Sequence, residues 1–102
     1  MFHPTLTYEE AQVLVEQGAQ LVDVRTADEY QRNALTGSVN IPLPVIQRAL
    51  KQLDKETPVL LFCNSGQRSG TAKRMLEACG FSQVHNLGSY LFYNNREQSR
   101  PQ

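Results

Sequence analysis

The sequence is short of several features that would place it in a specialised class of protein. It contains no tryptophan, two cysteines and two histidines among 102 residues. Two cysteines are too few for a structural zinc site built from thiolates. The ten basic residues balance ten acidic ones, and a net charge of zero argues against a general nucleic-acid binder or a binder of anionic membranes. The apolar runs are far shorter than a membrane-spanning helix requires.

The amino terminus also lacks the basic and apolar regions of a signal peptide. We therefore expect a cytoplasmic protein, or a periplasmic one if a signal has been removed. A chain of this length predicts a single domain with a modest core. We expect that domain to cover residues 1–93 and to be followed by a flexible tail at 94–102, where the sequence has nothing to bury.

Short apolar segments alternate with helical patterns along the chain. Strands are expected at four segments: 21–24, 38–41, 58–62 and 82–87. Helices are expected at about 8–17 and 27–31, each with a capping box, at an amphipathic segment from Pro44 to Leu53, and between the Cys63 loop and Gly80. This alternation predicts an α/β fold, with a mainly parallel sheet of about five strands and helices on both faces.

The two cysteines are not expected to form a disulfide. Most of the chain between Cys63 and Cys79 has a helical pattern, and its eleven helical residues would separate them by roughly 16 Å. Bridged cysteines have Cα atoms within about 7 Å of each other. Cys79 lies on an apolar helical stripe and is predicted to be a core residue, which leaves Cys63 as the candidate reactive thiol.

The segment from Leu60 to Thr71 has the strongest chemical character. An apolar run ends at Cys63, a polar loop containing Gly66 follows, and a helical pattern then begins. Backbone N–H groups of such a loop and helix start converge on one point and favour an anion there. We therefore expect the pKa of the Cys63 thiol to be lowered, at the edge of the sheet where α/β folds bind ligands.

The spacing from Cys63 to Arg68 distinguishes between two kinds of chemistry. It is C-x4-R, one residue shorter than the C-x5-R phosphate loop of tyrosine phosphatases and arsenate reductases. A shorter loop makes a tighter ring of amides, which suits a single sulfur atom carried on the cysteine. The spacing thus favours sulfur chemistry over phosphate chemistry.

Five segments, in order, carry the motifs of a known family. They are Asp23-Val24-Arg25, Glu29-Tyr30, Gly37–Pro42, the loop from Cys63 to Ser69, and Gly80-Phe81 with Val84–Gly88. Over about residues 5 to 90 the chain therefore resembles the rhodanese family of thiosulfate and persulfide sulfurtransferases, especially its single-domain bacterial members of the phage-shock type. The chain departs from the family pattern at Asn33-Ala34, where Gly-His is usual. It departs again at Ser89, which replaces a glycine, and in the absence of the tryptophan that follows.

The resemblance implies an enzyme that carries sulfur as a persulfide on Cys63, with no metal and no other cofactor. The donor would be thiosulfate or a persulfide, and the acceptor a thiol, cyanide or a thiol-bearing partner protein, with no nucleic acid or membrane as partner. The loop residues would stabilise negative charge on sulfur; they are Asn64, Ser65, Gly66, Gln67, Arg68 and Ser69. Asp23, Arg25 and Glu29 would form a supporting structural charge network.

Two roles remain open for each of two loop residues. Arg68 either attracts an anionic donor or braces the loop, and Ser69 either caps the following helix or donates to the sulfur. Two other functions also remain open for the whole chain. One is a non-enzymatic sulfur carrier or regulatory docking module on the same scaffold, and the other is a small cysteine-dependent phosphatase or arsenate reductase.

Overall fold

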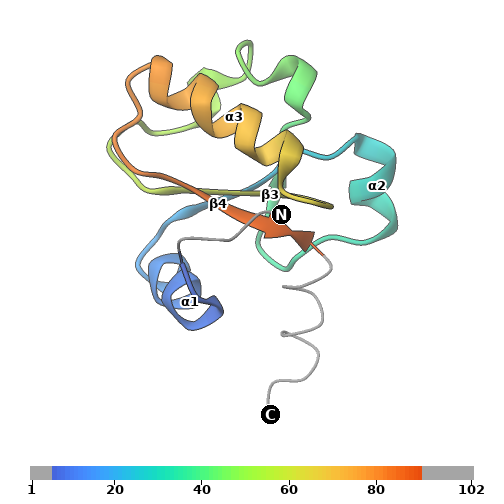
Figure 1. The fold of residues 1–102 in the computed structure, drawn as a ribbon, viewed down its shortest axis with the longest axis horizontal. Helices are drawn as coiled ribbons and strands as arrows, with labels where there is room; N and C mark the ends of the chain where they lie inside the picture. The colour runs from blue at the N-terminus through green and yellow to red at the C-terminus, as the bar shows by residue number, and fades with distance from the viewer. Residues whose placement is uncertain (1–5, 91–102) are drawn as a thin grey trace.

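The computed structural model describes residues 6–90, which form an α/β fold of three layers (Figure 1). Its strands are β1 (Gln20–Asp23), β2 (Val39–Asn40), β3 (Val59–Cys63) and β4 (Val84–Ser89). Its α-helices are α1 (Tyr8–Glu16), α2 (Ala27–Arg32) and α3 (Gln67–Ala78). Helix α3 covers one face of the sheet and α1 the other (Figure 1), which confirms the predicted layers. No helix within residues 6–90 has the length and apolar character to cross a membrane.

The sheet is parallel throughout and has the strand order β2-β1-β3-β4. The expectation of about five strands is wrong for the described residues, which contain four. The count differs because the other apolar segments face the core from helices and loops instead of extending the sheet. With all strands parallel, the carboxyl ends of β1, β3 and β4 meet at one edge.

Strand β3 separates two hydrophobic clusters. Its residues are all buried, and Val59, Leu61 and Cys63 point toward the α3 side. Leu60 and Phe62 point toward the α1 side. This alternation, with both faces apolar, is what the continuous apolar run predicted for a central parallel strand.

The main difference from the predicted fold lies between Pro44 and Leu53, where one amphipathic helix is expected. The structure has two short 3-10 helices there, η1 (Leu43–Val45) and η2 (Leu50–Gln52), joined by turns. Ile46 and Ala49 are nonetheless buried in the α3-side cluster. Apolar residues spaced by three satisfy a 3-10 helix as well as an α-helix, so the pattern predicted the buried face correctly and the helix type wrongly.

The helix ends follow the sequence signals closely. Both capping boxes form, Thr7 with Glu10 at α1 and Thr26 with Glu29 at α2. Helix α3 ends in a Schellman motif, because the Phe81 N–H donates to the Leu76 carbonyl at 3.1 Å while Gly80 takes a positive φ of 94°. These local signals fix where α1 and α2 begin and where α3 ends.

Some of the sequence predictions fall outside the described residues. They concern the tail at 94–102 and the two ends of the predicted domain, residues 1–5 and 91–93. Tyr90, the last described residue, is buried with the α1-side cluster.

Candidate active site

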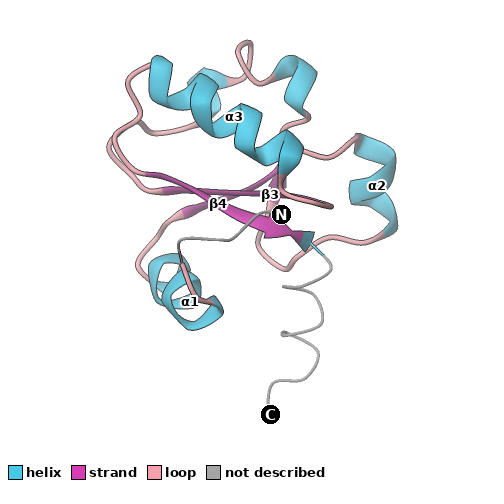
Figure 2. Ribbon diagram, in the orientation of Figure 1, coloured by secondary structure: helices cyan, strands magenta, loops and turns pink. Residues whose placement is uncertain are grey.

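Cys63 is the last residue of β3, and its loop leads directly into α3 (Figure 2). The turn depends on Gly66, which caps α3 in the left-handed conformation with φ 90°. A residue with a Cβ adopts this conformation only at an energetic cost. The glycine therefore allows the chain to curl back over the cysteine and begin a helix within three residues.

The sulfur of Cys63 lies among hydrogen-bond donors. The Gly66 N–H donates to Sγ at 3.1 Å, and the Ser69 hydroxyl lies 3.4 Å from it. Burial of Cys63 would raise the pKa of its thiol. Hydrogen bonds from the Ser69 side chain and from the backbone of Ser69, Ser65 and Gly66 outweigh that effect and lower the pKa. The geometry thus favours a thiolate, as the sequence predicted.

Asn86 of β4 holds this arrangement together, and sequence reasoning did not single it out as a site residue. Its amide donates to the Gly66 carbonyl at 2.9 Å, and its Oδ1 accepts from the Ser69 hydroxyl at 2.6 Å and from the Gly88 N–H at 2.9 Å. Asn86 is 7% exposed. The one signal in the sequence is that Asn86 belongs to the Val84–Gly88 segment of the family motif.

Asn86 and Leu87 lie on opposite faces of β4, as neighbouring strand residues do, and a bulge follows Asn86. Asn86 pairs with Leu61 and Gly88 with Phe62, so Leu87 is the extra residue. Leu87 packs in the α1-side cluster, while Asn86 reaches Ser69 on α3. The register shift is a tertiary feature that the alternation of residues in the sequence did not reveal.

Arg68 braces the loop through Glu29 of α2. Its Nη1 and Nη2 lie 2.8 and 3.2 Å from the two carboxylate oxygens of Glu29. Glu29 also accepts from the Asn64 side chain at 2.7 Å. Hydrogen bonds from Arg68 and from the Thr26 backbone lower the pKa of Glu29 to about 2. One carboxylate therefore caps α2 and fastens two residues of the Cys63 loop.

Asp23 and Arg25 form a separate buried ion pair. Arg25 Nη2 lies 2.7 Å from Asp23 Oδ2, and the same nitrogen donates to the Asn33 carbonyl at 2.6 Å. Within residues 6–90 no ion pair joins Glu29 to Asp23 or Arg25. The predicted supporting network is thus two pairs, one beneath the carboxyl edge of the sheet and one on the loop.

The remaining predicted residues lie on the Cys63 loop or at the far end of α3. Asn64, Ser65 and Gln67 are exposed at the surface of the loop. Cys79 is half-buried against the α3-side cluster, and both cysteines are free, as predicted. The site thus consists of one buried thiol, a ring of backbone and hydroxyl donors, and an exposed polar rim.

The chain is similar in sequence to known proteins of one family. The family description "Rhodanese-like domain" matches residues 7–93. The thiosulfate sulfurtransferase PspE of Escherichia coli is 36% identical over 69 residues, which are 66% of this chain and 66% of that protein, just under two thirds. The thiosulfate sulfurtransferase GlpE of Pseudomonas savastanoi is 38% identical over 79 residues, covering 78% of this chain and 74% of the relative.

Solved structures give the same result for the fold. A structure described as a rhodanese with anions from E. coli aligns with a TM-score of 0.67 at 36% identity, covering 72% of this chain and 89% of that one. The human single-domain sulfurtransferase TSTD1 aligns with a TM-score of 0.81 over 98% of this chain and all of that one. Its identity is 23%, so this second likeness concerns the fold alone.

Proposed function

The chain belongs to the rhodanese-like domain family, and we propose that it is a sulfurtransferase that carries sulfur on Cys63. The observation that supports this most directly is the Cys63 sulfur inside its loop, with the Gly66 N–H at 3.1 Å and the Ser69 hydroxyl at 3.4 Å. Donors arranged around a thiol stabilise the thiolate, and a loop of such donors also suits the negative charge of a persulfide. The likeness to relatives named thiosulfate sulfurtransferase supports the same proposal.

The first half-reaction loads the cysteine. The Cys63 thiolate attacks the outer sulfur of thiosulfate, a new S–S bond forms to Sγ, and the bond between the two thiosulfate sulfurs breaks. Sulfite leaves with the electron pair of that bond, and Cys63 becomes a persulfide anion. No proton moves and no oxidant is consumed, so a thiol with a lowered pKa is the only activation that the step needs.

The second half-reaction returns the cysteine to its starting state. The sulfur of an acceptor thiolate, or the carbon of cyanide, attacks the outer sulfur of the persulfide. The bond to Sγ breaks and leaves the Cys63 thiolate, while the acceptor leaves as a new persulfide or as thiocyanate. The covalent intermediate divides one transfer into two steps in the manner of ping-pong catalysis.

Arg68 and Ser69 have different roles in this proposal. Since both oxygens of Glu29 hold the Arg68 guanidinium, Arg68 shapes the loop and adds positive charge near the sulfur. Ser69 lies beside the sulfur itself and turns its hydroxyl toward the anionic forms. The loop thus forms a cradle before transfer begins, in which only the Ser69 hydroxyl has to turn.

Steady-state turnover tests the proposal. We expect the wild type to convert thiosulfate and cyanide to sulfite and thiocyanate, Cys63→Ser to be inactive, and Cys79→Ser to keep wild-type activity. Loading of Cys63 without repeated turnover, with any of several acceptors, would instead identify a sulfur carrier. Activity retained in Cys63→Ser would overturn the proposal.

A further inference from the structure

A pocket of about 340 Å³ lies beside the Cys63 loop, between that loop and α2. It is lined by Arg25, Glu29, Arg32, Asn33, Asn64 and Tyr90. Asn64 is the residue next to Cys63, so a ligand in the pocket lies next to the sulfur-carrying loop. The volume lies in the range that holds small organic ligands, which is more than a thiosulfate ion needs.

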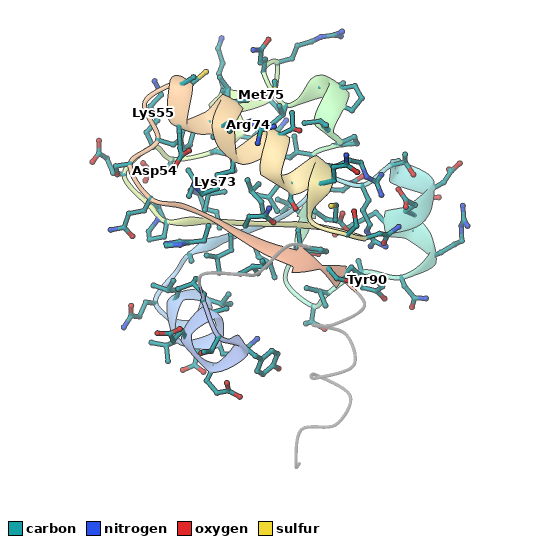
Figure 3. All side chains as sticks on the ribbon, in the orientation of Figure 1. Asp54, Lys55, Lys73, Arg74, Met75 and Tyr90 are labelled. Carbon is teal, nitrogen blue, oxygen red and sulfur yellow. The ribbon has the colours of Figure 1, made fainter. Side chains whose placement is uncertain are left out.

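Tyr90 lines the pocket and has a buried hydroxyl without a partner. Figure 3 shows Tyr90 at the carboxyl end of β4, on the side where α2 lies. The residue is 3% exposed, and its hydroxyl is the only buried side-chain oxygen or nitrogen without a hydrogen-bond partner in residues 6–90. Its ring is fixed by Phe62, at 6.3 Å between centroids, and by the Arg25 guanidinium 4.1 Å from the ring centre. A buried hydroxyl held in this way is expected to meet a polar ligand.

The charge on the pocket wall is positive. Arg32 is exposed and forms no ion pair with another described residue. Arg25 is paired with Asp23 through Nε and Nη2, so Nη1 is the nitrogen that remains to meet a ligand. The Glu29 carboxylate is already bound by Arg68 and Asn64. Donors and one uncompensated positive charge suit an anionic oxygen ligand such as a carboxylate.

We propose that this pocket binds the carboxylate of a low-molecular-weight thiol, or of its persulfide, whose sulfur end reaches Cys63. Arg32 and the Tyr90 hydroxyl recognise the carboxylate, while the rest of the molecule fills the space along Asn33 and Asn64. This inference rests on the proposed sulfur transfer and names the class of its substrate. Thiosulfate loads the cysteine without using the pocket. A preference for carboxylate-bearing substrates should therefore appear in the reaction with the acceptor.

Two acceptors that differ only at the end remote from sulfur test the proposal. With thiosulfate as donor, kcat/KM is measured for 3-mercaptopropionate and for 3-mercapto-1-propanol. We expect the wild type to have the higher kcat/KM with the carboxylate thiol. Arg32→Gln and Tyr90→Phe should each reduce this preference. For Arg32→Gln, which loses the charged pair with the carboxylate, the reduction should be about tenfold. Both variants should keep wild-type activity with cyanide. Equal kcat/KM for the two thiols in the wild type would overturn the proposal.

Arg74→Gln is the matched control. Arg74 is an exposed arginine on α3, well away from Tyr90 in Figure 3, so its loss removes the same charge without touching the pocket. The wild-type preference should survive in this variant. A preference lost equally in Arg74→Gln and Arg32→Gln would show a long-range charge effect and would contradict a specific subsite.

A binding measurement separates failure of the pocket from failure of the sulfur transfer. Cys63→Ser protein is titrated with 3-(methylthio)propionate, which has the carboxylate but no reactive thiol, and chemical shifts are followed by NMR. We expect saturable shifts at Asn33, Asn64 and Tyr90 that Arg32→Gln in the same background weakens. Saturation would support the subsite even if turnover were absent, and no shift at these residues would overturn it.

Discussion

At the scale of single residues, the site depends on where one hydroxyl proton points. Ser69 has one proton, and its oxygen lies 2.6 Å from Asn86 Oδ1 and 3.4 Å from the Cys63 sulfur. When the sulfur is a thiol, the Ser69 hydroxyl donates best to Asn86 Oδ1. When the sulfur is a thiolate or a persulfide anion, the hydroxyl donates best to the sulfur. The hydroxyl therefore stabilises the anionic forms selectively.

Ser69→Ala tests this role directly. The Ser69 hydrogen bond is the largest of the interactions that lower the pKa of Cys63, so its loss should raise that pKa. The pH at which iodoacetamide alkylates Cys63 at half its maximal rate should then move to higher pH. A Cys79→Ala background restricts the measurement to Cys63, and an unchanged midpoint would contradict the role.

Asn86→Asp tests the residue that positions both loop and hydroxyl. The change keeps an acceptor for Ser69 and Gly88 but replaces the donor to the Gly66 carbonyl with a charged oxygen. We expect a stability loss of about 1–3 kcal/mol for the broken buried hydrogen bond, and a higher pKa of Cys63 because negative charge is added nearby. Denaturant melts and the alkylation profile measure the two effects.

Gln83→Glu provides the control for the Asn86 variant. It adds the same charge just before the opposite end of β4, at an exposed position. Its thiol pKa and stability should stay close to those of the wild type. Matching shifts in both variants would show that any added negative charge has this effect, and would contradict a specific role for the position of Asn86 beside the loop.

At the scale of elements, the loop from β3 to α3 requires one glycine in the left-handed conformation. Gly66→Ala places a Cβ at φ 90°, which costs about 1–2 kcal/mol and opens the curl over Cys63. Gly18→Ala is the matched control, because Gly18 has φ 102° with open space around its side-chain position. Both variants should lose similar stability in thermal melts, and Gly66→Ala alone should lose sulfur transfer. Full activity in Gly66→Ala would contradict the role of the turn.

The same elements show which parts of the fold and of the site can be predicted from the sequence alone. Capping boxes, the Gly80 stop and the apolar run of β3 are local signals, and each predicted its element. The segment from 44 to 53 was assigned the wrong helix type because residues spaced by three serve both types. Asn86 and Tyr90 are not predicted as site residues because the pairing of β4 with β3, and for Tyr90 also the bulge after Asn86, bring them beside the loop. This pairing between segments distant in the chain is not apparent from the sequence.

At the scale of the whole molecule, the Glu29–Arg68 pair links active-site geometry to acid stability. The pKa of Glu29 is lowered from its ordinary value of 4.5 to about 2. A lowered carboxyl pKa contributes stability in full above pH 4.5, and that contribution disappears as the pH falls toward 2. The pair is partly exposed, so we expect a contribution of about 1 kcal/mol after solvent screening.

Glu29→Gln measures that contribution. Its unfolding free energy should lie below that of the wild type at neutral pH, and the difference should shrink as the pH falls from 4.5 toward 2. Glu10→Gln changes the corresponding residue of the other capping box and keeps the Glu29–Arg68 pair, so it measures what the loss of a capping carboxylate alone costs. A difference for Glu29→Gln that is constant with pH would contradict the account.

The central claim is that Cys63 carries one sulfur atom, and mass spectrometry of the intact protein tests it most directly. After thiosulfate is added and removed, the wild type and Cys79→Ser should each gain the mass of one sulfur atom, which cyanide then removes. Cys63→Ser should gain nothing. An unmodified wild type, or an equal gain in Cys63→Ser, would contradict the account.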